Sequence, residues 1–190
     1  LAGFWLIPAF GSRNALLIFT VAALLAGALM AAAAVWGTAR PHVPARGMAW
    51  TLGCTAGLAM LFPAHWDLDK LSEGSNVYFF PQQWGKVIDH AESAEGGLTT
   101  VTQSADGLLT LLTNGKFQGN NSEQGEMIAQ KSIALIPLLH TAQRDTALVI
   151  GYGTGMTPRV IHENEFRSLD IAELSEDMVR LADRHFENIN

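Results

Sequence analysis

The chain has 190 residues, a formal net charge of −6 and 48% hydrophobic residues, and these averages conceal a sharp division. No Asp or Glu precedes Ala64, where the only charged residues are Arg13, Arg40 and Arg46. All eighteen acidic residues and the other nine basic ones follow. An acidic soluble part lacks the basic face that nucleic-acid phosphates require, so a nucleic-acid partner is not expected. Since Cys54 is the only cysteine, no disulfide can form within one chain.

Residues 1–63 are predicted to be a membrane-helical region. Residues 15–36 form an apolar run in which Thr20 is the only polar side chain. About 20 apolar residues cross the hydrocarbon core as a helix, so this run predicts a transmembrane span, and it is too long for the core of a signal peptide. A buried soluble helix is the alternative. A shorter apolar run at 47–63 predicts a second, weaker span that packs through its small residues.

The sequence predicts a multi-pass protein of the cell membrane, with the lipid bilayer as a partner and the soluble part in the cytoplasm. Two spans would return the soluble part to the side on which Arg13 lies. Basic residues flank both ends of the first run, so their distribution gives no firm orientation. The chain begins at Leu1, within apolar sequence, which predicts a fragment with further membrane helices upstream.

The soluble part is predicted to begin with a linker, 64–90, and a small antiparallel β-domain with one helix, 91–141. Asp106-Gly107 and Asn114-Gly115 separate runs of β-forming residues, which indicates tight turns. The expected strands are 98–104, 108–113 and a short one from 116, and the expected helix is 126–140 with its end near Pro137.

Residues 142–190 are predicted to form the first part of a Rossmann-like, nucleoside-binding domain. A continuous apolar strand at 146–150 leads into the loop Gly151-Tyr-Gly-Thr-Gly155, and a helix follows. A second strand, 168–172, ends at Glu173, and Ser175 is a good N-cap for a last helix. The fold class is therefore membrane helices followed by α/β, with a small antiparallel β-domain and a truncated Rossmann-like domain.

The glycine loop carries the chemistry that the sequence predicts. Glycines let the backbone turn sharply and let a ligand approach the loop amides. Glu173 lies 22 residues after Gly151, near the spacing at which a carboxylate receives ribose hydroxyls. Met156 stands where a dinucleotide fingerprint requires glycine, so an adenosyl-sulfonium ligand is favoured over a dinucleotide. A glycine-rich turn without a ligand is the alternative.

From about Trp66 onward the chain resembles the spermidine synthase (polyamine aminopropyltransferase) family, in particular its membrane-fused bacterial branch. The order and spacing of several short motifs carry the resemblance. They are Glu95-Gly96, Leu112-Thr-Asn-Gly-Lys-Phe-Gln118, Glu126-Met-Ile-Ala-Gln130, Leu135-Ile-Pro-Leu-Leu-His140, Leu148-Val-Ile-Gly-Tyr-Gly-Thr-Gly155 and Ala172-Glu-Leu-Ser-Glu-Asp-Met178.

The resemblance implies a transferase that uses decarboxylated S-adenosylmethionine as co-substrate and passes its aminopropyl group to a small amine such as putrescine. It implies no metal, and assembly of identical copies is compatible with it. By matching position, two glutamines would line the cleft, the glycines and the threonine would form the loop, and a glutamate would hold the ribose. These binding residues are Gln118, Gln130, Gly151, Gly153, Thr154, Gly155 and Glu173.

The chain departs from the family at three places. Thr154 stands where the family has an Asp that holds the cationic end of the donor, Ala129-Gln130 replaces a Tyr-His pair, and Ser175 replaces the Asp after the ribose Glu. The Asp-bearing catalytic loop is expected beyond Asn190, so no catalytic residue is assigned within the chain.

Three functions stay open: aminopropyl transfer, methyl transfer from intact S-adenosylmethionine, and a non-catalytic membrane protein that keeps the fold. Two parallel strands alone leave apolar faces uncovered, because parallel sheets are normally buried on both sides. The chain by itself is therefore expected to be inactive and poorly folded beyond about Arg144.

Overall fold

The structure is a computed structural model that describes residues 5–36, 53, 56, 57, 60 and 62–190. It divides into two compact units, Leu1–Trp66 and Asp67–Asn190, which are taken separately below. The predicted second membrane span, 47–63, lies outside the described residues except at scattered positions.

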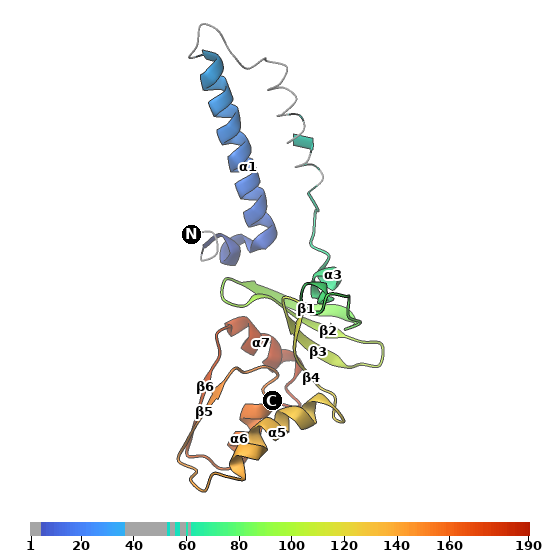
Figure 1. Ribbon diagram of the computed structural model, residues 1–190, viewed down its shortest axis with the longest axis vertical. Helices are drawn as coiled ribbons and strands as arrows, with labels where there is room; N and C mark the ends of the chain where they lie inside the picture. Colours follow the sequence, from blue (N-terminus) through green and yellow to red (C-terminus); the bar gives the residue numbers. More distant parts are fainter. Residues whose placement is uncertain (1–4, 37–52, 54–55, 58–59, 61) are drawn as a thin grey trace. The chain divides into compact units, whose positions relative to one another are not determined.

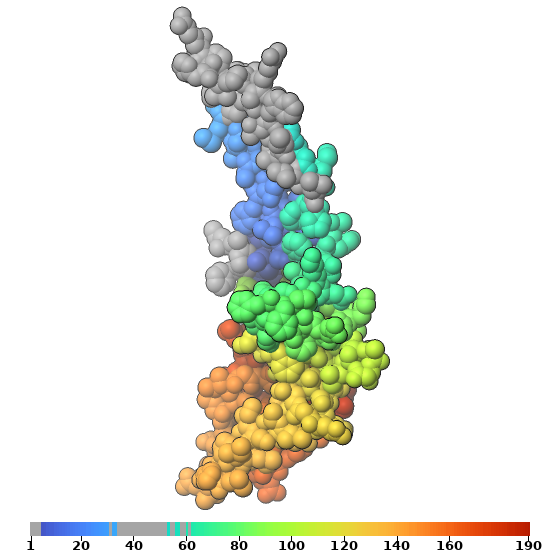
Figure 2. All heavy atoms as spheres, turned by 45° about the vertical axis from the view of Figure 1, so that its right-hand side comes forward, coloured from blue at the N-terminus to red at the C-terminus, as the bar shows by residue number. Residues whose placement is uncertain are grey.

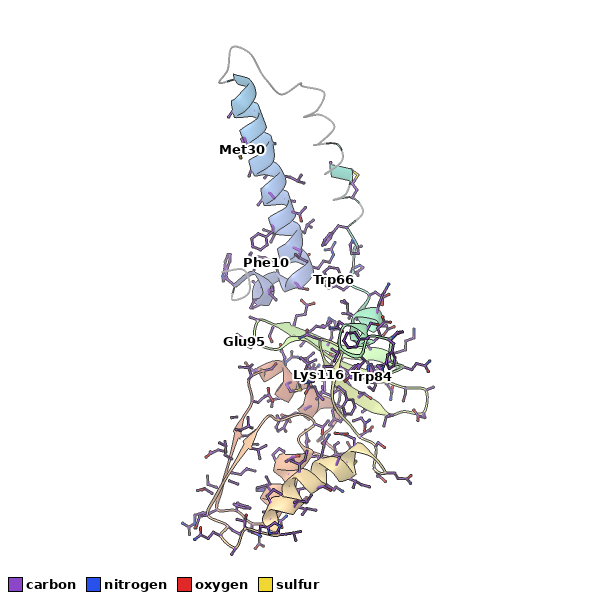
Figure 3. All side chains as sticks on the ribbon, in the orientation of Figure 1. Phe10, Met30, Trp66, Trp84, Glu95 and Lys116 are labelled. Carbon is purple, nitrogen blue, oxygen red and sulfur yellow. The ribbon has the colours of Figure 1, made fainter. Side chains whose placement is uncertain are left out.

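The first unit contains one long helix, α1 (Ile7–Trp36), with Phe10 and Met30 toward its two ends (Figure 3). Its stretch Ile7–Met30 is long and apolar enough to cross a membrane, and only 6% of its most apolar 18-residue window is buried. Thr20, the polar side chain of the predicted span, donates its hydroxyl proton to the carbonyl of Leu16 at 2.9 Å. Within the described residues α1 is the one helix that meets the length and composition of a membrane span.

A break at Gly11 divides α1. Gly11 has φ 77° and ψ 161°, which is not helical, and the short piece before it turns away from the long piece after it (Figure 1). Residues that carry a side chain rarely adopt this backbone conformation, so the glycine allows the bend. The helix also begins eight residues before the predicted span.

The second unit begins with a four-stranded antiparallel sheet in the order β1-β2-β3-β4 (Figure 1). The three predicted strands are confirmed, and β1 precedes them with a bulge between Val87 and Asp89. Val101, Leu111 and Leu112 are fully buried in the sheet. The strands are β1 (Lys86–Ser93), β2 (Gly97–Gln103), β3 (Leu109–Thr113) and β4 (Lys116–Asn120).

The segment predicted as a linker, 64–90, holds two short helices and the start of β1. The helices are α3 (Leu68–Ser72) and α4 (Ser75–Tyr78). The carboxylate of Asp67 caps α3 by accepting from the Lys70 amide, and the Ser72 hydroxyl donates to Thr100 on β2. Trp84 stacks on Phe117 at 5.6 Å between ring centroids, and its position beside the sheet is labelled in Figure 3. These contacts hold the segment against the sheet, and Tyr78 and Trp84 serve packing there, whereas Phe79 and Phe80 are largely exposed.

The α/β part follows in the predicted order. Strands β5 and β6 pair in parallel, from Thr146 with Ser168 to Ile150 with Ala172. Ser175 caps the last helix by accepting from the Met178 amide, as predicted. Pro137 lies inside the last turn of α5 and the helix ends one residue later. The elements are α5 (Glu126–Leu138), β5 (Thr146–Ile150), α6 (Met156–Glu163), β6 (Ser168–Ala172) and α7 (Glu176–His185).

One hydrophobic core joins the sheet to the helices of this unit. Helix α7 packs on β1 and β2 (Figure 1). The predicted apolar stripe of Met178, Leu181, Ala182 and Phe186 is buried. By contrast, Leu148 and Ile150 on β5 are 62% and 83% exposed. Large apolar side chains of α5, which is yellow to orange in Figure 2, are also exposed. The antiparallel sheet and α7 therefore supply most of the core.

Candidate functional site

The glycine loop between β5 and α6 is built on three residues with positive φ. Gly151, Gly153 and Gly155 have φ of 88°, 58° and 86°. A Cβ built on Gly151 would meet nothing within 4 Å, and one on Gly153 only the Gln118 carbonyl at 3.7 Å. On Gly155 it would lie 2.2 Å from the Asn190 Cβ. The first two glycines therefore leave one side of the loop backbone open to approach, while the third packs against the protein.

Glu173, at the end of β6, holds the loop in place. One of its oxygens accepts from the Tyr152 amide at 2.7 Å and the other from the Ser175 amide at 3.0 Å. The carboxylate thereby ties the glycine loop to the start of α7. Each carboxylate oxygen has a second lone pair, so the group can still accept from a hydroxyl.

Tyr152 fastens the same loop to the far end of α7. Its hydroxyl donates to Asp183 at 2.6 Å, and Asn190 donates to the same Asp183 oxygen at 3.1 Å. Burial, together with the hydrogen bond to the Asp183 carboxylate, raises the pKa of Tyr152 to about 12. The phenol therefore stays protonated and remains a donor at every physiological pH.

A buried polar chain lies beneath the loop. The Thr154 hydroxyl donates to the Gln130 side-chain oxygen at 2.6 Å, and the Gln130 amide nitrogen donates to Glu126 at 3.1 Å. Thr154 is 1% exposed and Gln130 is 7% exposed. A Cβ on Gly119 of β4 would lie 2.4 Å from the Gln130 nitrogen, so this glycine makes room for the pair. The Thr154 hydroxyl is thus an uncharged donor that already has its acceptor.

These groups line a cavity of about 630 Å³. Its polar wall contains five of the seven predicted binding residues, together with Glu126, and its apolar wall comes from α5, β5 and Phe166. The predicted residues on the wall are Gln118, Gln130, Gly151, Gly153 and Thr154. Gly155 and Glu173 are not on this wall, although both shape the loop that forms part of it. Amide and hydroxyl groups beside open loop backbone suit hydrogen bonding to the uncharged groups of a ligand such as a nucleoside.

Sequence reasoning gave no role to the side chains of Glu126, Tyr152 and Asp183. Glu126 precedes Gln130 by four residues on one helix, and that spacing could have paired them. The contact between Tyr152 and Asp183 joins residues 31 apart, and no local pattern signals it. Among the residues that the structure describes, no three His, Cys, Asp or Glu side chains gather as a metal site would require.

Together these elements form an α/β arrangement that follows a small antiparallel sheet in the chain. It consists of a strand, a glycine loop, a helix and a second strand that is followed directly by a carboxylate. No family model matches the sequence, and no curated protein matches it.

Several solved structures are similar to the chain, and two of them are spermidine synthases. One is the spermidine synthase of Thermotoga maritima, with 18% identity and a TM-score of 0.46 over 55% of this chain and 36% of that one. The other is a spermidine synthase in complex with the transition-state analogue AdoDATO, with the same identity and TM-score over 55% and 35%. The chain thus spans about a third of the length of these structures. At this distance the similarity carries no conclusion about activity.

Proposed function

We propose that this chain is part of a membrane-anchored transferase of the spermidine synthase type, which moves an aminopropyl group from decarboxylated S-adenosylmethionine to a small amine. The observation that carries the proposal is the glycine loop. Its backbone is open at Gly151 and Gly153, Glu173 braces it, and the polar side chains of Gln118 and Gln130 lie on the same cavity wall. The family resemblance of the sequence motifs supports the same assignment.

In this proposal the loop and Glu173 bind the adenosyl half of the donor, and Gln118, Gln130 and Thr154 lie toward its sulfonium end. The amine nitrogen attacks the carbon next to the sulfonium, the carbon–sulfur bond breaks, and its electron pair leaves with sulfur as a neutral thioether. The nitrogen loses a proton to a base. Such a displacement depends mainly on holding the two reactants in line, which is the role assigned to these residues.

Methyl transfer from intact S-adenosylmethionine is the second candidate, and the state of Thr154 favours it. A carboxylate beneath the loop would attract a purely cationic donor tail and repel one that keeps its own carboxylate. Thr154 is neutral, buried and hydrogen-bonded to Gln130. It therefore removes the repulsion that an acidic residue at this loop position would add, although the Glu126 carboxylate lies on the same cavity wall.

We also propose a multi-pass location in the cell membrane with the soluble part on the cytoplasmic side. The length, apolar composition and low burial of α1 support the membrane location. In this location the substrates of the α/β part are water-soluble small molecules, and identical copies can associate in the bilayer.

Calorimetry on the intact protein in detergent tests the function. We expect decarboxylated S-adenosylmethionine to bind, and Glu173→Gln to weaken it at least tenfold, because an amide cannot accept from both backbone N–H groups and a ribose hydroxyl. Glu187→Gln is the matched control, an exposed carboxylate beyond the end of α7 whose loss should leave binding unchanged.

The preferred donor decides between the candidates. Tighter binding of the decarboxylated form supports aminopropyl transfer, and tighter binding of the intact form supports methyl transfer. If neither nucleoside binds, both proposals fail and a non-catalytic role remains.

A further inference from the structure

The cavity beside the glycine loop contains a charged group to which the proposed transfer gives no role. Of the described residues that line the cavity, only Glu126 carries a charged side chain, and the other lining side chains are apolar or neutral. Glu126 is partly buried and lies in the first turn of α5. A carboxylate on the wall of an otherwise uncharged cavity lowers the electrostatic energy of a cation that binds there.

Gln130 connects this carboxylate to the glycine loop. Its side-chain nitrogen donates to Glu126 at 3.1 Å, and its side-chain oxygen accepts from the Thr154 hydroxyl at 2.6 Å. Since a carboxylate can only accept hydrogen bonds, Glu126 faces the amide nitrogen and leaves the amide oxygen for Thr154. The backbone carbonyl of Gln130 also accepts from the Thr157 hydroxyl at 3.1 Å. Two consecutive side-chain hydrogen bonds therefore set the position of Glu126 relative to the loop.

The carboxylate of Glu126 has acceptor positions beyond the one that Gln130 occupies. An ionised carboxylate offers about four such positions, and the Gln130 nitrogen takes one of them. Within the described part of the chain, no Lys, Arg or His forms an ion pair with Glu126. A cation on the ligand would therefore supply a counter-charge that the described residues do not.

A glutamate at this place also has an explanation that needs no ligand. The first turn of a helix favours acidic side chains, because the N-terminal end of the helix dipole is positive. Glu176 takes the corresponding place in α7, where it is exposed and does not line the cavity. A comparison of Glu126 with Glu176 thus separates the effect of the helix end from the effect of the cavity.

We infer that Glu126 recognises positive charge in the ligand: the loop and Glu173 bind the adenosyl half, and a cationic tail extends along the cavity to the Glu126 carboxylate. This inference rests on the proposed function and deepens it, since it names a nucleoside with a cationic tail as the class of ligand. It gives the tail an acidic partner although Thr154 is neutral. Of the two donors it favours the decarboxylated one, whose tail lacks a carboxylate that Glu126 would repel.

Calorimetry with three adenosyl ligands on the intact protein in detergent tests the inference. Decarboxylated S-adenosylmethionine has a purely cationic tail, intact S-adenosylmethionine adds a carboxylate to it, and methylthioadenosine is neutral. We expect Glu126→Gln to weaken binding of the first about tenfold or more, of the second less, and of the third by less than about twofold. A glutamine keeps an acceptor for Gln130, so this variant removes the charge and retains the hydrogen bond. The control Glu176→Gln should weaken none of the three.

The salt dependence of binding is a readout that a packing defect would not change. Raising the salt concentration from about 0.05 M to about 0.5 M screens a contact between charges at a partly exposed site. The affinity of the unaltered protein for the decarboxylated ligand should fall several-fold over this range, and Glu126→Gln should lose most of that dependence. The affinity for methylthioadenosine should change little in either protein.

The pattern of results separates this inference from the proposed function. Equal weakening of all three ligands by Glu126→Gln, or no weakening of the cationic one, would overturn the role of Glu126 and leave the proposed function standing. If the unaltered protein binds none of the three ligands, the proposed function fails, and the role assigned to Glu126 fails with it.

Discussion

At the scale of single residues, the pair formed by Thr154 and Gln130 is the most constrained polar contact of the candidate site. Thr154→Val keeps the shape of the side chain and leaves the buried Gln130 oxygen without a donor. An orphaned buried acceptor costs about 1–3 kcal/mol. We expect that loss in the free energy of unfolding of the intact protein, measured with urea and followed by circular dichroism.

A second variant separates this cost from a simple packing defect. Thr154→Val combined with Gln130→Met removes both polar partners at once, so the double variant should be more stable than the sum of the single losses by about 1 kcal/mol or more. Strict additivity of the two single losses would contradict the hydrogen bond.

The residue scale also shows what sequence reasoning can and cannot reach. The positive φ of Gly151 and Gly153 and the place of Glu173 directly after β6 could be predicted, because glycine favours positive φ and the strand before Glu173 is visible in the sequence. The two backbone N–H groups that Glu173 accepts could not, because they depend on how the turn folds around the carboxylate. The contact of Thr154 with Gln130 requires a helix and a loop 24 residues apart to pack together.

At the scale of elements, a charged cluster fastens α7 to β1. One oxygen of Asp89 accepts from Arg184 at 2.8 Å and lies 2.7 Å from the His185 Nε2, while the other accepts from the His90 amide. Burial alone would raise the pKa of Asp89, but the hydrogen bonds from His185 and Arg184 outweigh it and lower the pKa from 3.8 to about 2. The folded protein therefore favours the charged carboxylate.

The sign of this shift sets a pH dependence. Because the folded pKa lies below the unfolded one, the stabilisation is complete above about pH 5 and is lost as the pH falls from 3.8 through 2. We expect Asp89→Asn to lower the free energy of unfolding by about 1–2 kcal/mol at pH 7 and to make no difference below pH 2. Chemical unfolding across this pH range measures it.

Asp170→Asn, an exposed carboxylate on β6, is the control and should have little effect at any pH. A loss for Asp89→Asn that stays constant from pH 7 to pH 2 would show that shape, and not charge, holds the two elements together.

Among the elements, β1 and the short helices α3 and α4 are those that the sequence did not predict. The residues of β1, Lys86–Ser93, show little regular alternation, since the strand lies at the edge of the sheet and a bulge follows Val87. Strands β2 and β5 were predicted because the first lies between clear turn signals and the second is continuously apolar. The short helices α3 and α4 depend on contacts with the sheet, which local sequence does not encode.

At the scale of the whole molecule, the two sheets of the second unit differ in how much they bury. In β5 only Val149 is buried, and in β6 no residue is, whereas most of β2 and β3 is buried. We expect the backbone amides of 146–172 to exchange with deuterium at least tenfold faster than those of 97–113, because a poorly covered sheet opens more readily. Mass spectrometry of the whole chain gives both rates. Equal protection of the two sheets would mean that the parallel pair is stable with the cover it has.

The bend at Gly11 determines how long the straight part of α1 is. A continuous α1 of 30 residues would be a rod of roughly 45 Å, about half again as long as the 30 Å hydrocarbon layer is thick. Such a mismatch forces a helix to tilt or the surrounding lipid to stretch. By turning the first piece aside, one glycine shortens the rod that a bilayer has to accommodate. The straight piece after Gly11 has 25 residues and is roughly 38 Å long, so in the proposed membrane location it would need less tilt than the unbroken helix.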